Sequence, residues 1–208
     1  MMIEIENILD AEKYLDGIQA VIFDLDDTLY SEKEYVKSGY HAIAEAFNDT
    51  SLEEKLWNFS QQGRKTLDEV LESKEVIGRK EEAWQIYRFH FPVIHFYPGV
   101  REMIERIREN RKIGIITDGR PAGQRNKIKA LGLDAMADHI IVTDELGGIE
   151  FRKPNQLAFQ IMRERMNVPY ESMVYIGDNL KRDFISPEKL GMRSIHFLNR
   201  DARYYQDP

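Results

Sequence analysis

The chain has 208 residues, 42% of them hydrophobic, so it can bury a core of its own, and it has no cysteine for disulfides or thiolate metal sites. Its formal net charge of -7 is spread along the sequence without a dense basic tract, which argues against a nucleic-acid partner. No apolar run is long enough to span a membrane and the first 15 residues do not resemble a signal peptide, so we expect a cytoplasmic protein.

The chain begins with residues 1–17, in which acidic and apolar residues alternate. We expect a peripheral helix there and assign it no role. Residues 20–25 follow as a short apolar run rich in branched side chains, which is typical of a buried strand.

Residues 30–97 differ from the rest, because they contain no convincing strand. Apolar residues recur there at three- and four-residue spacing, which predicts helices over 35–47, 52–62, 64–73 and 81–91. A loop of this length is improbable in a compact domain, so we interpret 30–97 as an inserted helical cap domain. Residues 1–29 and 98–208 would then form the core domain.

The remaining chain alternates apolar runs with segments of helical period. Strands are predicted over 112–117, 139–143, 173–176 and 193–198, and helices over 100–110, 124–131, 155–166 and 183–190. This alternation is typical of an α/β fold with a doubly wound, Rossmann-like parallel sheet.

Two carboxylates, Asp24 and Asp26, come at the end of the first predicted strand. Ligands of open parallel sheets bind at that edge, where one carboxylate could attack while the other handles a proton. An Asp-x-Asp alone is more often a turn or a helix cap than a catalytic pair.

Further polar residues follow the later strands in order. These are Thr117, Asp118 and Gly119, then Lys153, and then Asp178 and Asp183. A hydroxyl followed by backbone N–H groups at a helix start suits phosphate oxygens, and a lysine there can add positive charge. Each element alone is common. Finding all of them by chance, in this order and each at the end of a strand, is improbable.

Together these residues resemble the motif set of the haloacid dehalogenase superfamily of hydrolases, in its capped phosphatase branch. The resemblance rests on Asp24-Leu25-Asp26-Asp27-Thr28, Thr117, Lys153, Gly177-Asp178 and Asp183. It implies a Mg²⁺-dependent phosphatase that acts on a small phosphorylated metabolite, such as a sugar phosphate or a nucleotide.

The resemblance also implies roles for the residues. Asp24 would be the nucleophile, forming an aspartyl-phosphate, and Asp26 the general acid and base. Asp24, the backbone carbonyl of Asp26, Asp178 and Asp183 would hold the metal. The phosphate would contact Thr117, Asp118, Gly119 and Lys153. We also expect a neighbouring negative charge and partial burial to raise the pKa of Asp26 enough for it to donate a proton.

One departure from the resemblance is Asp118, where phosphatases of this kind commonly carry asparagine. If this position contributes only its backbone N–H, the change is tolerable. If its side chain touches the phosphate, its negative charge would weaken binding.

Substrate choice should lie in the helical segment. Tyr30, Tyr35, His41 and Arg64 are candidates for contacting the leaving group, although aromatic residues on helices are more often core. Residues 120–128 are similar to a helix start in sugar-phosphate and nucleotide phosphatases, yet Gln, Arg and Lys there are also typical of an exposed helix.

Three other kinds of protein share some of these sequence features and remain alternatives. A phosphomutase or phosphonate hydrolase of the same superfamily is the nearest alternative, because a mutase uses the same motifs. A signalling receiver domain is also doubly wound and acidic, but its phosphorylated aspartate lies on a later strand. A scaffold that has kept the fold and lost the chemistry is the third alternative.

Overall fold

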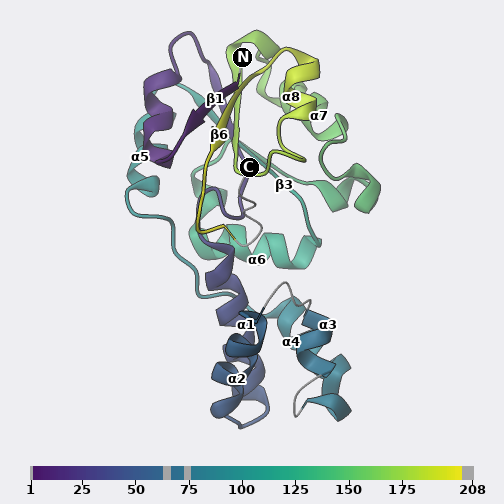
Figure 1. Cartoon of the computed structure of the whole chain (residues 1–208). Helices are drawn as coiled ribbons and strands as arrows, with labels where there is room; N and C mark the ends of the chain where they lie inside the picture. Colours follow the sequence, from purple (N-terminus) through teal and green to yellow (C-terminus); the bar gives the residue numbers. More distant parts are fainter. Residues whose placement is uncertain (1, 63–66, 73–75, 203–208) are drawn as a thin grey trace.

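The computed structural model describes residues 2–62, 67–72 and 76–202 and contains one sheet of six parallel strands (Figure 1). The strands are β1 (Met2–Ile5), β2 (Ala20–Phe23), β3 (Lys112–Thr117), β4 (His139–Val142), β5 (Met173–Gly177) and β6 (Arg193–Phe197), in the order β1-β6-β5-β2-β3-β4. All pairings are parallel, which confirms the doubly wound α/β fold.

Alternate residues of each strand enter two different cores. Val21 and Phe23 of β2 belong to the cluster under 3₁₀-helix η1 (Ile8–Tyr14) and helices α5 (Val100–Arg108) and α6 (Pro121–Leu131). Ala20 and Ile22 belong to the cluster under α7 (Leu157–Met166) and the residues around α8 (Ile185–Leu190). Burial on both faces explains why the central strands are continuous apolar runs.

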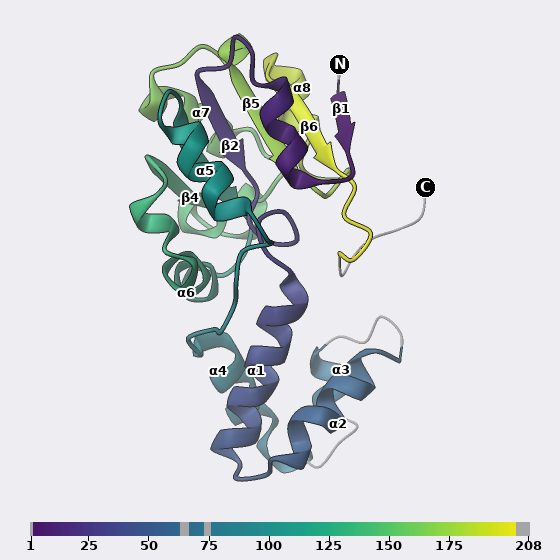
Figure 2. The ribbon, with the colours of Figure 1, turned by 90° about the vertical axis from the view of Figure 1, so that its left-hand side faces the viewer.

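The first segment, where we expected a peripheral helix over 1–17, begins with a strand and continues as the short 3₁₀-helix η1. β1 pairs in parallel with β6 along its whole length and forms an edge of the sheet (Figure 2). Only Ile5 of β1 is buried, so its alternating pattern reflects an exposed edge strand. The short helix η1 then packs beside α5.

Helices α1–α4 make up the predicted helical segment and extend away from the sheet (Figure 1). They are α1 (Glu32–Ala46), α2 (Ser51–Ser60), α3 (Leu67–Glu72) and α4 (Lys80–Phe89). The predicted helix over 64–73 lies partly outside the described residues. These helices surround a hydrophobic cluster that runs from Val36 to Ala83 and contains no residue of the sheet.

The chain enters and leaves this helical segment at adjacent positions. Tyr30 forms an antiparallel bridge with Phe96, and the Tyr97 N–H donates to the Leu29 carbonyl oxygen at 3.0 Å. The division into a core domain and a cap domain at 29/30 and 97/98 stays a prediction. Within the described part of the chain, no helix combines the length and apolarity that a bilayer crossing needs.

Candidate active site

The carboxyl ends of three adjacent strands place the predicted residues together. Asp24 follows β2, which lies between β5 and β3, so Asp178 and Asp118 flank it on either side. The segment after 3₁₀-helix η5 (Ile149–Phe151) brings Lys153 to the same edge. This is the edge at which open parallel sheets bind ligands.

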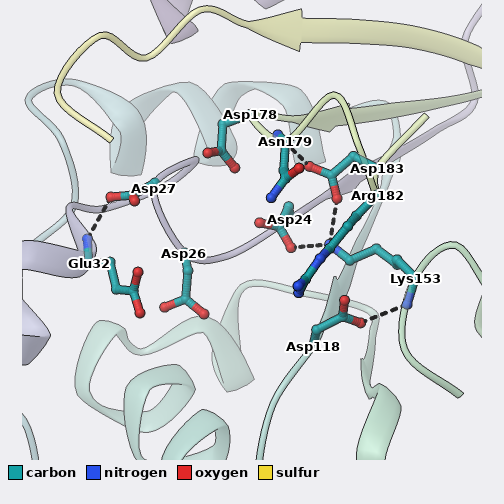
Figure 3. A pocket seen from close by; sticks show the side chains of 10 residues that line it. All are labelled: Asp24, Asp26, Asp27, Glu32, Asp118, Lys153, Asp178, Asn179, Arg182 and Asp183. Atoms are coloured by element: carbon teal, nitrogen blue, oxygen red, sulfur yellow. Dashed lines mark hydrogen bonds and ion pairs between the residues drawn. The ribbon is translucent and has the colours of Figure 1, made fainter. Parts of the chain in front are cut away.

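A cavity of about 200 Å³ opens at this edge (Figure 3). Its lining consists of acidic side chains with few cations: Asp24, Asp26, Asp27, Glu32, Asp118, Lys153, Asp178, Asn179, Arg182 and Asp183. Of the predicted site residues, only Thr117 and Gly119 do not line it. Glu32, Asn179 and Arg182 are lining residues that the sequence analysis did not single out, and Asp27 is one to which it gave no role.

Lys153 is the buried cation of this cavity. Its Nζ donates to Asp24 Oδ1 at 2.5 Å, to Asp183 Oδ1 at 2.7 Å and to the Tyr175 hydroxyl oxygen at 2.9 Å. Burial alone would lower the pKa of Lys153, but the carboxylates of Asp183 and Asp24 raise it well above its ordinary value. Lys153 therefore carries a fixed positive charge beside Asp24.

Three carboxylates, those of Asp24, Asp178 and Asp183, form a cluster in which one oxygen of each lies within 4.8 Å of the others. Burial, together with the negative charges of Asp24 and Asp183, raises the pKa of Asp178 to about 9. Burial also raises the pKa of Asp24 well above its ordinary value. Carboxylates in this arrangement repel one another, and hard oxygen donors suit a hard divalent cation, so the cluster could hold one.

The neighbours of the cluster fix the orientation of its members. Asp183 Oδ2 accepts the Asn179 N–H at 2.9 Å, and the Thr28 hydroxyl donates to Asp178 Oδ1 at 3.3 Å. A Cβ added at Gly177 would lie 2.3 Å from Asp183 Oδ2, so only glycine leaves room there. The Asp26 side chain is not a member of the cluster, and the metal ligand expected from Asp26, its backbone carbonyl, stays a prediction.

Asp118 links the loop that carries Lys153 to the sheet. Its Oδ1 accepts the Thr143 hydroxyl at 2.9 Å and the Lys153 backbone N–H at 3.0 Å. An asparagine carbonyl oxygen could accept both hydrogen bonds equally well, so this contact does not require the negative charge. Asp118 Oδ2 is buried and has no hydrogen-bond partner among the described residues.

Thr117 and Gly119 do not line the cavity, and both lie next to the Gln124 side chain. The Thr117 hydroxyl accepts from Gln124 Nε2 at 2.5 Å and is buried. Gly119 has a φ of 142°, which favours glycine, and a Cβ there would lie 3.1 Å from the Gln124 side chain. Their roles in phosphate binding stay predictions.

Asp26 is held by helix α6, a contact that the sequence interpretation missed. Lys127 Nζ lies 2.7 Å from Asp26 Oδ1, and Gln124 Nε2 donates to Asp26 Oδ2 at 2.8 Å. The Tyr30 hydroxyl also donates to Asp26 Oδ1. Lys127 and Gln124 belong to the segment 120–128, for which an exposed helix was one of the two alternatives, and both are buried.

The expected rise in the pKa of Asp26 is wrong for this arrangement. Burial does act to raise that pKa, but the charge and hydrogen bond of Lys127 outweigh it and lower the pKa. Burial alone would lower the pKa of Lys127, but the nearby carboxylates, that of Asp26 first, outweigh it and raise that pKa. Asp26 is therefore held as a carboxylate while Lys127 lies beside it.

Replacing Lys127 with methionine should lower the free energy of unfolding by about 3 kcal/mol, because a largely buried carboxylate loses its partner. The change should cost much less in an Asp26→Asn background, where no charge is left unpaired. Lys129→Met, on the exposed side of α6, is the matched control. Denaturant unfolding of the wild type, the two single variants and the double variant measures the coupling between Lys127 and Asp26. An equal loss of unfolding free energy in the wild-type and Asp26→Asn backgrounds would contradict it.

The four residues considered for contact with the leaving group lie in different parts of the molecule. Tyr30 is fully buried against Asp26, and Tyr35 packs its ring 4.1 Å from Lys127 Nζ. His41 pairs with Glu53 at 2.7 Å on the helical segment and does not line the cavity. Arg64 lies outside the described residues.

Comparison with known proteins identifies the family of this chain. The sequence profile of the haloacid dehalogenase-like hydrolases matches residues 21–197. Glyceraldehyde 3-phosphate phosphatase of Methanocaldococcus jannaschii is 27% identical, with 91% of this chain and 89% of the relative covered. The phosphatase of the same name from Methanopyrus kandleri is 30% identical, with 86% and 83% covered.

Solved structures share the fold. A HAD phosphatase from Thermococcus onnurineus superposes with a TM-score of 0.58 at 23% identity, over 91% of this chain and 90% of the other. A HAD hydrolase from Bacillus subtilis gives a TM-score of 0.63 at 19% identity, over 92% and 90%. With the family profile covering all strands except β1, this chain belongs to the haloacid dehalogenase-like hydrolases.

Proposed function

We propose that this protein is a Mg²⁺-dependent phosphatase that hydrolyses a small phosphomonoester through a phosphorylated Asp24. The observation that carries the proposal is the position of Asp24 at the centre of the sheet edge. There it contacts Lys153 at 2.5 Å, shares a carboxylate cluster with Asp178 and Asp183, and lines the same cavity as Asp26.

The reaction would proceed in two displacements at phosphorus. An oxygen of Asp24 attacks the phosphorus, the ester P–O bond breaks, and the departing oxygen takes a proton from Asp26. Asp26 then removes a proton from water, which attacks the phosphorus and releases inorganic phosphate as the Asp24–phosphorus bond breaks. Before the first proton transfer, the Asp26 carboxyl group has to leave Lys127 and become protonated.

Positive charge is needed because carboxylates and a phosphate ester repel one another. Lys153 supplies one fixed charge beside Asp24. Asp24, Asp178 and Asp183 would hold Mg²⁺, which when bound neutralises charge on the phosphoryl oxygens. Tyr175 would position Lys153 through the hydrogen bond to its Nζ.

The substrate we propose is a small phosphorylated metabolite, in keeping with the cytoplasmic location expected from the sequence. The cavity of about 200 Å³ favours a short leaving group over a bulky nucleoside. The named relatives, glyceraldehyde 3-phosphate phosphatases, support a sugar phosphate.

The direct test is phosphate release by the purified full chain from a panel of sugar phosphates, nucleotides and phosphonates. We expect Mg²⁺-dependent release from short sugar phosphates without a bisphosphate activator, which separates the phosphatase from a phosphomutase. No release from any ester with Mg²⁺ present, or release that is unaffected by a chelator, would contradict the proposal.

Asp178→Asn should change how the protein responds to the metal. Without Mg²⁺ at neutral pH the variant should melt at a higher temperature than the wild type, because burying Asp178, whose pKa is raised to about 9, costs folding free energy that an uncharged asparagine does not. Added Mg²⁺ should raise the melting temperature of the wild type, since it binds the folded state, and do so much less for the variant. Thermal unfolding with EDTA and with Mg²⁺ measures both effects.

Asp134→Asn, at an exposed position, is the control for Asp178→Asn. It should leave both melting temperatures and their metal response as in the wild type. An equal response of Asp178→Asn and the wild type to Mg²⁺ would argue against a metal at the cluster.

A further inference from the structure

Two cationic side chains, those of Lys153 and Arg182, line the cavity. A phosphoryl group that reaches Asp24 needs hydrogen-bond donors there, as the proposed function requires, on which this inference rests. An ammonium group has three N–H donors, and those of Lys153 are directed at the carboxylates of Asp24 and Asp183 and at the Tyr175 hydroxyl oxygen. Lys153 can therefore supply charge to a phosphoryl oxygen, but a hydrogen bond only if one of these contacts breaks.

The guanidinium group of Arg182 is the cation of the cavity whose donors are free. Within residues 2–62, 67–72 and 76–202, it forms no hydrogen bond and no ion pair. The side chain is exposed and still lines the cavity. All of its N–H donors are thus available to a ligand.

The loop after β5 fixes the backbone of Arg182 at the carboxylate cluster. The backbone N–H groups of Arg182 and Asp183 both donate to the Asn179 carbonyl oxygen, at 3.0 and 2.9 Å, and the Asn179 N–H donates to Asp183 Oδ2. From this loop the Arg182 side chain extends into the part of the cavity between Asp24 and Asp118 (Figure 3). A phosphoryl group transferred to Asp24 would lie within this part of the cavity.

We propose that Arg182 is a substrate-binding residue whose guanidinium group donates hydrogen bonds to the phosphoryl oxygens of the ester. The planar guanidinium can bind two oxygens of one phosphate through parallel N–H donors, which an ammonium group cannot do. The contact is made to the group that all phosphomonoesters share. It therefore adds affinity for every ester, and for the product inorganic phosphate, without selecting the leaving group.

Inorganic phosphate and two esters with unlike leaving groups test this proposal. At saturating Mg²⁺, Arg182→Gln should raise the inhibition constant of inorganic phosphate about tenfold, the effect of losing a charge-assisted hydrogen bond. It should lower kcat/KM by a similar factor for 4-nitrophenyl phosphate and for glycerol 3-phosphate. Arg182→Lys keeps the charge without the planar fork and should recover only part of the loss.

Two controls separate this contact from general effects of charge. Lys189→Met removes one positive charge from an exposed position of α8 and should behave as the wild type in both assays. Thermal unfolding with EDTA and with Mg²⁺ should show that Arg182→Gln keeps the metal response of the wild type. Loss of that response would make the weaker phosphate binding a consequence of weaker metal binding and overturn the proposal.

The outcomes distinguish this inference from the proposed function. Unchanged inhibition by phosphate in Arg182→Gln, or a loss with only one of the two esters, would overturn the phosphoryl contact and leave the phosphatase standing. Absence of hydrolysis of every ester would overturn the phosphatase, and calorimetry with inorganic phosphate would then decide the inference. Binding about tenfold weaker in Arg182→Gln than in the wild type would support it, and equal binding would overturn it.

Discussion

Replacing Asp24 with asparagine is expected to lower kcat about 10⁴-fold or more, because the amide removes the nucleophile while keeping the shape of the side chain. Asp24 is buried at the end of the central strand and its Oδ1 contacts Lys153 at 2.5 Å. Asp183 also contacts the fixed cation, but it does not follow the central strand as Asp24 does. Phosphate release under saturating Mg²⁺ measures the loss.

Asp183 is the comparison that makes this test specific. It also contacts Lys153, at 2.7 Å, but its second oxygen is occupied by the Asn179 N–H. Asp183→Asn should therefore weaken metal binding and still permit a phosphorylated Asp24 at high Mg²⁺ concentration. Acid quenching followed by mass measurement of the intact chain should detect the added phosphoryl group in Asp183→Asn and not in Asp24→Asn.

The outcome that would contradict the role of Asp24 is steady-state turnover in Asp24→Asn within a small factor of the wild type. Folding of the variant is checked by its circular dichroism and its thermal transition. Since the asparagine removes a repelling charge from a buried cluster, the metal-free variant should not be less stable than the wild type.

The sheet could be predicted from the sequence because its central strands are buried on both faces. Such strands are short, continuous apolar runs, and the helices between them carry a clear period. Glycine ends two of those helices, with Gly132 and Gly191 at φ values of 71° and 80°. β1 was missed because an edge strand with one buried residue has no such run.

The site was predictable only where its residues follow strands in a recognisable order. Asp24, Asp118 and Asp178 meet because parallel strands end at one edge of the sheet. Lys127 and Glu32 gave no comparable signal, since lysine and glutamate on helices are ordinarily exposed. Lys127 lies 101 positions from Asp26 in the sequence, and only the packing of α6 on the sheet brings them into contact.

The contact between Asp26 and Lys127 matters for the mechanism, because it fixes the state of the Asp26 carboxylate before substrate binds. Lys127, Gln124 and Tyr30 occupy both of its oxygens in this structure. The ionised form of Asp26 is the one that can accept a proton from water in the second displacement, although Lys127 lowers its pKa and makes it a weaker base. The first displacement needs the protonated form only when the leaving oxygen is strongly basic.

Asp26→Asn should therefore affect the two displacements differently. With 4-nitrophenyl phosphate, whose leaving group needs no proton, Asp24 should still be phosphorylated and release one nitrophenolate per chain in a burst. The later steady state should be slower by about 10²- to 10⁴-fold, because no base activates water. Stopped-flow absorbance measures both phases.

Glycerol 3-phosphate completes the test of Asp26, because its alkoxide leaving group does need a proton. The same variant should show no burst with this ester, since the first displacement is then slow as well. Lys127→Met keeps the carboxylate and removes its partner, so it should retain hydrolysis of the phosphorylated Asp24 and serve as the control for a disturbed α6. A single-phase time course at the wild-type rate in Asp26→Asn would assign the proton transfers to another group.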